Sequence, residues 1–95
     1  MMVTVIQVIP KANYKVDVYF SDGIIKECDV SHLVGQGVFK VLEDEDFYRN
    51  NCTVLNHTLA WTLDGKYDGA NCLDLDALVL YENGRTIQDS LNSVA

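Results

Sequence analysis

Basic side chains are scarce in this chain of 95 residues. Seven Lys and Arg residues stand against fourteen Asp and Glu residues, so the formal net charge at pH 7 is −7. Proteins that bind nucleic acid directly gain much of their affinity from cations that neutralise phosphates. The charge balance therefore argues against direct nucleic-acid binding, and a small basic protein is the expected partner.

Long apolar runs are absent as well. The longest, Ala77 to Tyr81, has five residues, whereas a membrane-spanning helix needs about twenty. The first residues also lack the basic-then-apolar order of a signal peptide. We therefore expect a cytoplasmic protein without a membrane partner. The remaining composition, 48% hydrophobic and 22% charged with one proline, is that of a globular chain with a single core.

Cysteine and histidine are too few and too dispersed for a clear metal or disulfide pattern. Cys28, Cys52 and Cys72 are widely spaced, and without an export signal they favour reduced thiols. Zinc is the alternative, because Cys28 with His32 and Cys52 with His57 form two ligand-like pairs. Both cysteines fall at the ends of strand-like runs, where neighbouring side chains point to different faces. We therefore expect no metal ligands and no cofactor.

Catalytic signatures are missing too. The sequence contains no glycine-rich phosphate loop, no G-x-S-x-G elbow and no H-E-x-x-H motif. Its densest group of carboxylates, residues 43–46, consists of neighbours that point in divergent directions, unlike the facing pair of a glycosidase. We therefore expect a protein that is not an enzyme and has no catalytic residues.

The N-terminal half shows the signals of one antiparallel hairpin. A β-branched run from Val3 to Ile9 predicts a first strand that Pro10 closes. Residues 14–20 alternate between apolar and polar side chains, which predicts a strand with one buried face. Asp22 and Gly23 then provide turn chemistry, and residues 24–30 form the returning strand.

The second half contains a second predicted hairpin, and short helices are expected between the two hairpins. Helical turns are expected at residues 31–34 and 38–42, and strands at 52–55 and 58–62 on either side of a turn at Asn56 and His57. The predicted fold is α+β: a small antiparallel sheet of about five strands built from two hairpin-like units, with short helices packed on one face.

A polar loop at residues 63–71 precedes the last elements. Its aspartates invite a calcium interpretation, but an EF-hand register from Asp64 places Lys66 and Leu75 at ligand positions. Turn formation is the alternative, and either Asp74 or Asp76 is expected to cap the helical turn that follows. We predict one domain over residues 1–82 and a polar tail, frayed or weakly helical, over residues 83–95.

Several short motifs follow one another in a recognisable order: V-Y-F-S-D-G at 18–23, D-V-S at 29–31, T-L-A-W at 58–61, C-L-D-L-D at 72–76 and L-Y-E at 80–82. This order resembles the small bacterial family called domain of unknown function 2442, over about Val3 to Glu82. The sequence departs from that family in two ways. Ala77 stands where the family commonly has proline, and the loop at 63–71 is longer than the short loop of many members.

The resemblance implies a compact α+β fold without an established catalytic activity. Some related proteins are joined to a helix-turn-helix module, and others are encoded beside a second small protein in arrangements that resemble toxin and antitoxin pairs. On that basis we expect a protein-interaction module, the acidic and antitoxin-like member of a two-protein system. The alternative from a different class is a small-molecule or metal-binding domain that uses the loop at 63–71.

Four adjacent carboxylates and a few aromatic side chains are the candidate interaction surface. A solvated helix end or loop is the leading explanation of such a carboxylate run, and packing beneath the last helix is the leading explanation of the tryptophan; contact with a partner is the alternative for both. Tyr19 and Tyr48 are also expected to be partly exposed. The candidate surface comprises Glu43, Asp44, Glu45, Asp46, Trp61 and Tyr67.

Overall fold

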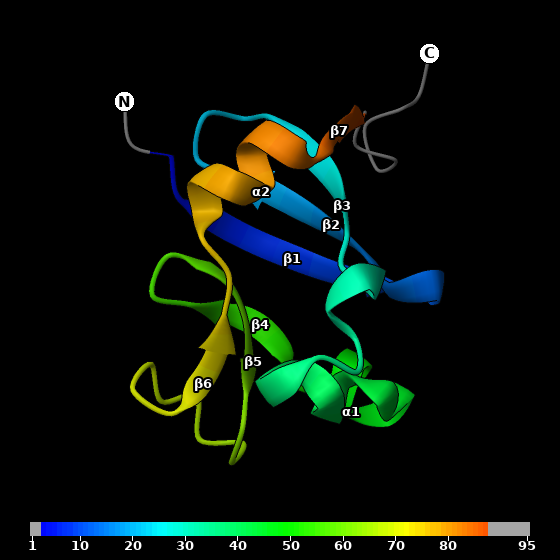
Figure 1. Cartoon of the computed structure of the whole chain (residues 1–95). Helices are drawn as coiled ribbons and strands as arrows, with labels where there is room; N and C mark the ends of the chain where they lie inside the picture. The colour runs from blue at the N-terminus through cyan, green and yellow to red at the C-terminus, as the bar shows by residue number, and fades with distance from the viewer. Residues whose placement is uncertain (1–2, 88–95) are drawn as a thin grey trace.

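The computed structural model describes residues 3–87 and contains two antiparallel sheets (Figure 1). The first, sheet A, has the strand order β1-β2-β3-β7, and the second, sheet B, has the order β4-β5-β6. The strands are β1 Val5–Lys11, β2 Lys15–Phe20, β3 Ile25–Asp29, β4 Cys52–Leu55, β5 Thr58–Thr62, β6 Cys72–Asp74 and β7 Arg85–Ile87. The predicted α+β class with antiparallel pairing is confirmed, and the strand count differs somewhat, since the described residues form seven strands in two sheets where about five strands in one sheet were expected.

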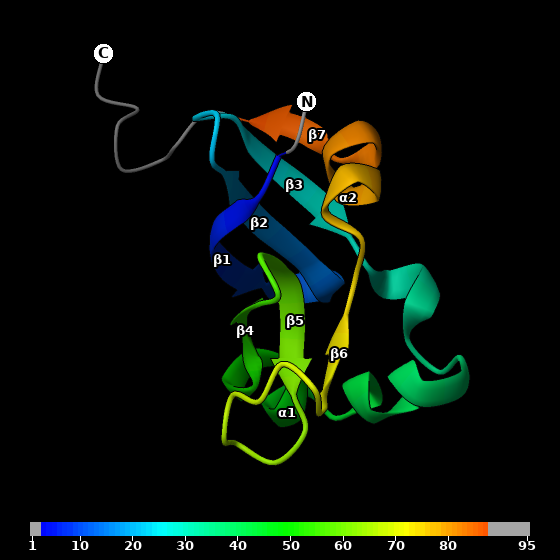
Figure 2. The same ribbon diagram turned by 90° about the vertical axis from the view of Figure 1, so that its left-hand side faces the viewer.

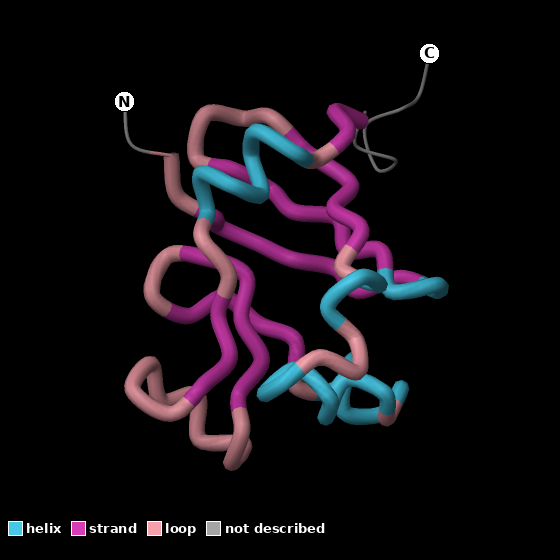
Figure 3. The backbone as a smooth tube through the Cα atoms, in the orientation of Figure 1, coloured by secondary structure: helices cyan, strands magenta, loops and turns pink. Residues whose placement is uncertain are grey.

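Five short helices connect these strands (Figure 3). They do not share one face of one sheet: α2 contacts β3 of sheet A, whereas α1 packs against η3 and β4 at the other end of the molecule (Figure 2). The helices are η1 Ala12–Tyr14, η2 Ser31–Leu33, η3 Gly37–Glu43, α1 Glu45–Asn50 and α2 Ala77–Asn83. No described helix has the length and apolar character needed to span a bilayer.

The first strand corrects the sequence prediction at both ends. Strand β1 begins at Val5 and runs through Pro10 to Lys11, with Pro10 opposite Val16 of β2. Proline lacks a backbone donor and is therefore confined mainly to edge strands. Strand β1 is at the edge of sheet A, so it uses one side of its backbone in the ladder and accommodates this proline.

The predicted turns are confirmed and set the register of both hairpins. The Asp22 Oδ1 atom accepts a hydrogen bond from the Ile24 amide at 2.9 Å, and Gly23 has a φ of +90°, which glycine adopts without strain. Asn56 and His57 form the two-residue turn between β4 and β5 with φ values of 54° and 62°. Positive φ at both positions is the geometry that matches the twist of a tight hairpin.

The core is continuous between the two sheets. Alternation along β2 buries Val16, Val18 and Phe20, as predicted. Strand β5 shows no such alternation, because all five of its residues are buried. It is the central strand of sheet B, and its threonines are covered: Thr58 donates to the Leu75 carbonyl, and Thr62 accepts from the Tyr67 amide.

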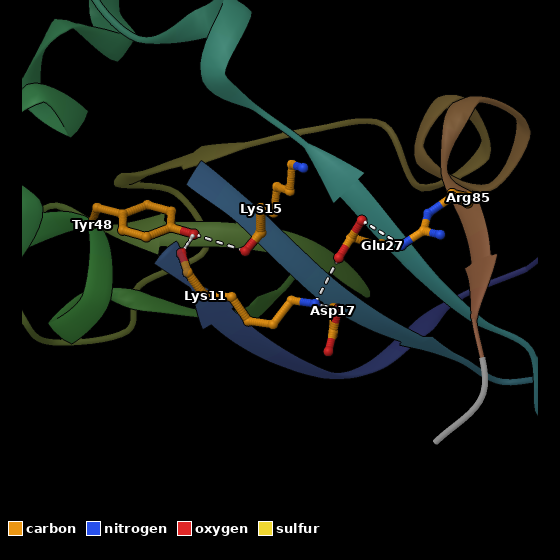
Figure 4. A network of polar contacts seen from close by, with 6 residues as sticks. All are labelled: Lys11, Lys15, Asp17, Glu27, Tyr48 and Arg85. Atoms are coloured by element: carbon orange, nitrogen blue, oxygen red, sulfur yellow. Dashed lines mark hydrogen bonds and ion pairs between the residues drawn. The ribbon is translucent and has the colours of Figure 1, made fainter. Parts of the chain in front are cut away.

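Tyr48 of α1 ties the two sheets together. Its hydroxyl lies 2.8 Å from the carbonyl oxygen of Lys11, the last residue of β1, and 3.0 Å from that of Lys15, the first residue of β2 (Figure 4). Its own carbonyl accepts a hydrogen bond from the indole nitrogen of Trp61 at 3.1 Å. The predicted partial exposure of Tyr48 is therefore wrong, since its exposed fraction is 2%.

The segment after residue 82 contributes a strand. Asn83 ends α2, Gly84 is its C-cap, and β7 then pairs with β3. A Cβ atom on Gly84 would lie 2.8 Å from the Leu80 carbonyl oxygen and 2.9 Å from the Cys28 sulfur, so this position has room for glycine alone. The predicted tail is thus an ordered strand over Arg85–Ile87, and its remainder, 88–95, lies outside the described residues.

Candidate functional site

The carboxylates of residues 43–46, the acidic segment, are exposed at the junction between η3 and α1. Glu43 ends η3, and Asp44 is the N-cap of α1, where its Oδ1 accepts from the amides of Asp46 at 3.0 Å and Phe47 at 3.4 Å. Glu45 and Asp46 occupy the first turn, where negative charge is favourable beside the positive end of the helix dipole. The acidic segment is therefore a helix start that also presents its charge to solvent.

The two aromatic members of the predicted surface have opposite locations. Trp61 has no exposed surface, so its interpretation as a core residue is confirmed and the alternative, an interface anchor, is wrong; its ring packs beside that of Tyr48. Tyr67 is 56% exposed on the loop at 63–71, with a φ of 56°. This loop and α1 lie at the same end of the molecule, the lower end in Figures 1 and 2.

The loop at 63–71 uses its carboxylates within itself. Asp64 accepts from the Lys66 amide at 2.9 Å and from the Asn71 side chain at 3.2 Å, and the hydrogen bond from the Lys66 amide holds its pKa below the ordinary value. Asp68 accepts from the Ala70 amide at 2.9 Å. These are Asx-type turns. Within residues 3–87, no three His, Cys, Asp or Glu side chains are grouped so that they could hold a metal ion.

The two aspartates expected to cap the last helix have separate roles. Asp76 is the N-cap of α2 and accepts from the amides of Leu78 at 2.8 Å and Val79 at 3.4 Å. Asp74 lies in β6 and accepts from the Asn56 side-chain amide at 3.1 Å. The cap is therefore Asp76, and Asp74 holds the β4–β5 turn against β6.

The cysteines lie in environments that favour the neutral thiol. Burial raises the pKa of Cys28 to about 11 and that of Cys52 to about 12, and the pKa of Cys72 is also raised. A nucleophilic or metal-binding cysteine needs the thiolate. The Cys28 sulfur instead contacts the Leu80 carbonyl at 3.7 Å in the core.

Sequence reasoning missed a charged network on the open face of sheet A (Figure 4). The Lys11 ammonium lies 2.8 Å from Asp17 and 2.7 Å from Glu27, and Arg85 lies 3.0 Å from Glu27. The hydrogen bond to Asp17 is the largest cause of the raised pKa of Lys11, and the bond from Lys11 is the largest cause of the lowered pKa of Glu27. The signal in the sequence that could have revealed this network was the charged residue at an outward position of each strand, Asp17 in β2 and Glu27 in β3.

The ion pairs divide the described chain into two regions. Residues 30–76, the acidic half, contain eight acidic and three basic residues, a formal charge of −5. Residues 3–29 with 77–87, the paired half, contain five acidic and four basic residues, a formal charge of −1. All three ion pairs formed among residues 3–87 lie in the paired half. The carboxylates of the acidic half are therefore not neutralised by ion pairs with the described residues.

Comparison with known proteins gave no match: no protein-family model, no curated protein and no solved structure is significantly similar to this chain. The resemblance carried by the motifs between residues 18 and 82 accordingly stays a prediction.

Proposed function

We propose that this chain is a small cytoplasmic interaction module that binds a basic protein through its acidic half. The observation that carries this proposal is the division of charge. The −5 formal charge of residues 30–76 is exposed in caps and turns. In the paired half, by contrast, Lys11 and Arg85 form ion pairs and Lys26 stacks on the ring of Tyr81. An unneutralised field of one sign steers an oppositely charged partner and orients it on approach.

The way the carboxylates are held supports recognition of a protein. Asp44 and Asp76 are fixed as helix caps, and Asp64 and Asp68 are fixed by turn amides. Their positions are set by backbone hydrogen bonds before a partner arrives, which lowers the entropy lost on binding. The resemblance to domain of unknown function 2442 adds the second part of the proposal, that the partner is encoded beside this chain as in toxin and antitoxin pairs.

The alternative function, a small-molecule or metal site on the loop at 63–71, has less support. Asp64 uses both carboxylate oxygens inside the loop, for the Lys66 amide and the Asn71 side chain, and no three ligand-type side chains are grouped within residues 3–87. A ligand that binds the native state raises the melting temperature by mass action. A rise in melting temperature with Zn²⁺ or Ca²⁺ that EDTA reverses would favour this alternative over the interaction module.

The experiment that tests the proposal compares two double variants with equal loss of charge. The first carries Glu45→Gln and Asp46→Asn, which leaves the Asp44 cap in place. The second, a control in the paired half, carries Asp22→Asn and Glu82→Gln, both at exposed positions. Tagged proteins are used to capture partners from the native host, and the bound protein is identified and quantified by mass spectrometry.

The expected result is a stoichiometric small basic protein that the wild type and the control retain and the first variant loses. Because both variants have the same net charge, a difference between them locates the contact in the acidic segment. Equal retention by both variants, or the absence of any basic protein from the wild-type sample, would overturn the proposal.

A further inference from the structure

A groove separates α2 from the end of β3 and from η2, on the side of the molecule where both helices lie in Figure 2. Its volume is about 220 Å³. One wall is formed by the end of β3 and by η2. The other is formed by α2 and the residues just before it, and Cys28 and Gly84 also line the groove. The apolar walls consist of Val30, Leu33, Leu75, Val79 and Leu80.

This groove leaves apolar surface in contact with water. Val79 lines it and is 51% exposed, and the adjacent Leu78 is 52% exposed. Covering exposed apolar surface in a concave site with another apolar group lowers the free energy, so such a site favours binding. An apolar cavity of about 150 Å³ accepts a benzene molecule, so this groove has room for one aromatic or leucine side chain.

The rim of the groove has charge of one sign. Asp29 and Asp76 are among the lining residues, with His32 and Asn83, and none of the lining residues is Lys or Arg. The Asp29 Oδ1 atom accepts from the Ser31 amide at 2.9 Å and the Ser31 hydroxyl at 2.6 Å, and the Asp76 Oδ1 atom accepts the α2 amides. Within residues 3–87, hydrogen bonds to both carboxylates reach Oδ1, which leaves Oδ2 able to accept from a cation.

We propose that this groove binds a short segment in which one aromatic or leucine side chain is flanked by Lys or Arg. The apolar side chain enters between Val30 and Val79, and the flanking cations reach Asp29 and Asp76. This inference rests on the proposed function, because it names the part of the basic partner that this chain recognises. The acidic half supplies the attraction, and the groove supplies selectivity for one apolar side chain.

Three synthetic peptides test the ligand chemistry. Each is acetylated and amidated, with the central sequence Lys-Phe-Lys, Lys-Ala-Lys or Glu-Phe-Glu, and each is titrated into ¹⁵N-labelled protein. For Lys-Phe-Lys, saturable chemical-shift changes are expected at the amides of Val30, Leu33 and Val79. The other two peptides are expected to bind about tenfold more weakly, because each lacks the apolar group or the favourable charge.

Two neighbouring positions on α2 provide a matched pair of variants. Val79→Arg places a cation in the groove, whereas Leu78→Arg makes the same change at an equally exposed position that does not line the groove. Both should fold, since neither residue is buried. We expect Val79→Arg to lose binding of the Lys-Phe-Lys peptide at least about tenfold and Leu78→Arg to retain it. The double variant Asp29→Asn with Asp76→Asn keeps both hydrogen-bond acceptors and is expected to weaken the peptide while sparing the fold.

The outcomes separate this inference from the proposed function. No saturable change at the groove, or equal losses in Val79→Arg and Leu78→Arg, would overturn the groove assignment. Capture of the basic host protein by Val79→Arg but not by the acidic-segment variant would do the same while the proposed function stands. If the peptide binds as expected and no basic protein is captured from the host, the proposed function fails and the ligand chemistry of the groove is supported.

Discussion

The paired half and the acidic half use carboxylates in different ways. In sheet A, Asp17 and Glu27 are direct cross-strand neighbours, and Lys11 and Arg85 neutralise them. In the acidic half, carboxylates accept backbone amides at turns and helix starts, as Asp44 and Asp64 do. The charge of the sheet A network thus contributes to the fold, whereas carboxylates that accept backbone amides at turns and helix starts remain available to a partner.

Register explains the first arrangement. Like charges directly opposite each other on a sheet destabilise it, and Asp17 opposite Glu27 is such a pair. The Lys11 ammonium bridges the two carboxylates from the end of β1. In the acidic half, backbone amides rather than side-chain cations partner carboxylates such as Asp44 and Asp64.

Removal of the largest buried side chain would test whether the two halves unfold together. Trp61→Ala is expected to reduce the free energy of unfolding by about 3–5 kcal/mol, since a fully buried tryptophan leaves a large cavity. Urea unfolding followed by far-ultraviolet circular dichroism and by NMR signals of sheet A measures both regions. Trp61→Phe should cost less. Separate transitions for the two sheets would contradict a shared core.

Loss of the Tyr48 hydroxyl would weaken the link between the halves. Tyr48→Phe is expected to cost about 1–2 kcal/mol, because the carbonyl oxygens of Lys11 and Lys15 lose the hydroxyl hydrogen that they share. Tyr67→Phe is the matched control, since Tyr67 is 56% exposed, and it should change stability by less than about 0.5 kcal/mol. Equal effects in thermal or urea unfolding would argue against the link.

Replacement of Lys11 would sharpen the contrast between the two uses of charge. Lys11→Met leaves Asp17 and Glu27 opposite each other without their shared cation, and a loss of about 0.5–1 kcal/mol is expected for this partly exposed network. Lys66→Met in the loop at 63–71 removes the same charge outside any described ion pair and should have little effect. Urea unfolding at low salt is the measurement, and added salt should reduce the difference.

The pH dependence of stability should follow the paired half. The pKa of Glu27 is lowered in the folded protein, first by Lys11 and then by Arg85, from an ordinary value of 4.5. A lowered pKa contributes stability that is present above pH 4.5 and is lost as the pH falls through the folded value. Glu27→Gln should therefore flatten the fall in melting temperature below pH 4.5. Arg85→Met should flatten it less than Lys11→Met, and the reverse order would refute this assignment.

The features predicted from sequence are those set by neighbouring residues. The turns at Asp22–Gly23 and Asn56–His57 follow from residues that tolerate positive φ or accept local amides, and the cap at Asp76 follows from the same chemistry. The polar loop at 63–71 is likewise visible in composition. Each of these predictions needs no knowledge of distant contacts.

The features that escaped prediction depend on distant contacts. Strand β7 has three residues, too few to show a period, and its partner β3 is distant in the sequence. The contact between Trp61 and Tyr48, whose carbonyl accepts the indole hydrogen, joins two different elements. The groove combines residues 28–33 with residues 75–84, so no local pattern could reveal it.

The pairing of β7 with β3 has a consequence for local opening of the native protein. It joins Glu27 and Arg85 across 58 positions of sequence through a three-residue strand, and short ladders that close long loops open at low energetic cost. When β7 lifts away, Gly84 no longer lies against the Cys28 sulfur. The rate at which a thiol reagent modifies Cys28 would then measure, in real time, how often β7 separates from β3.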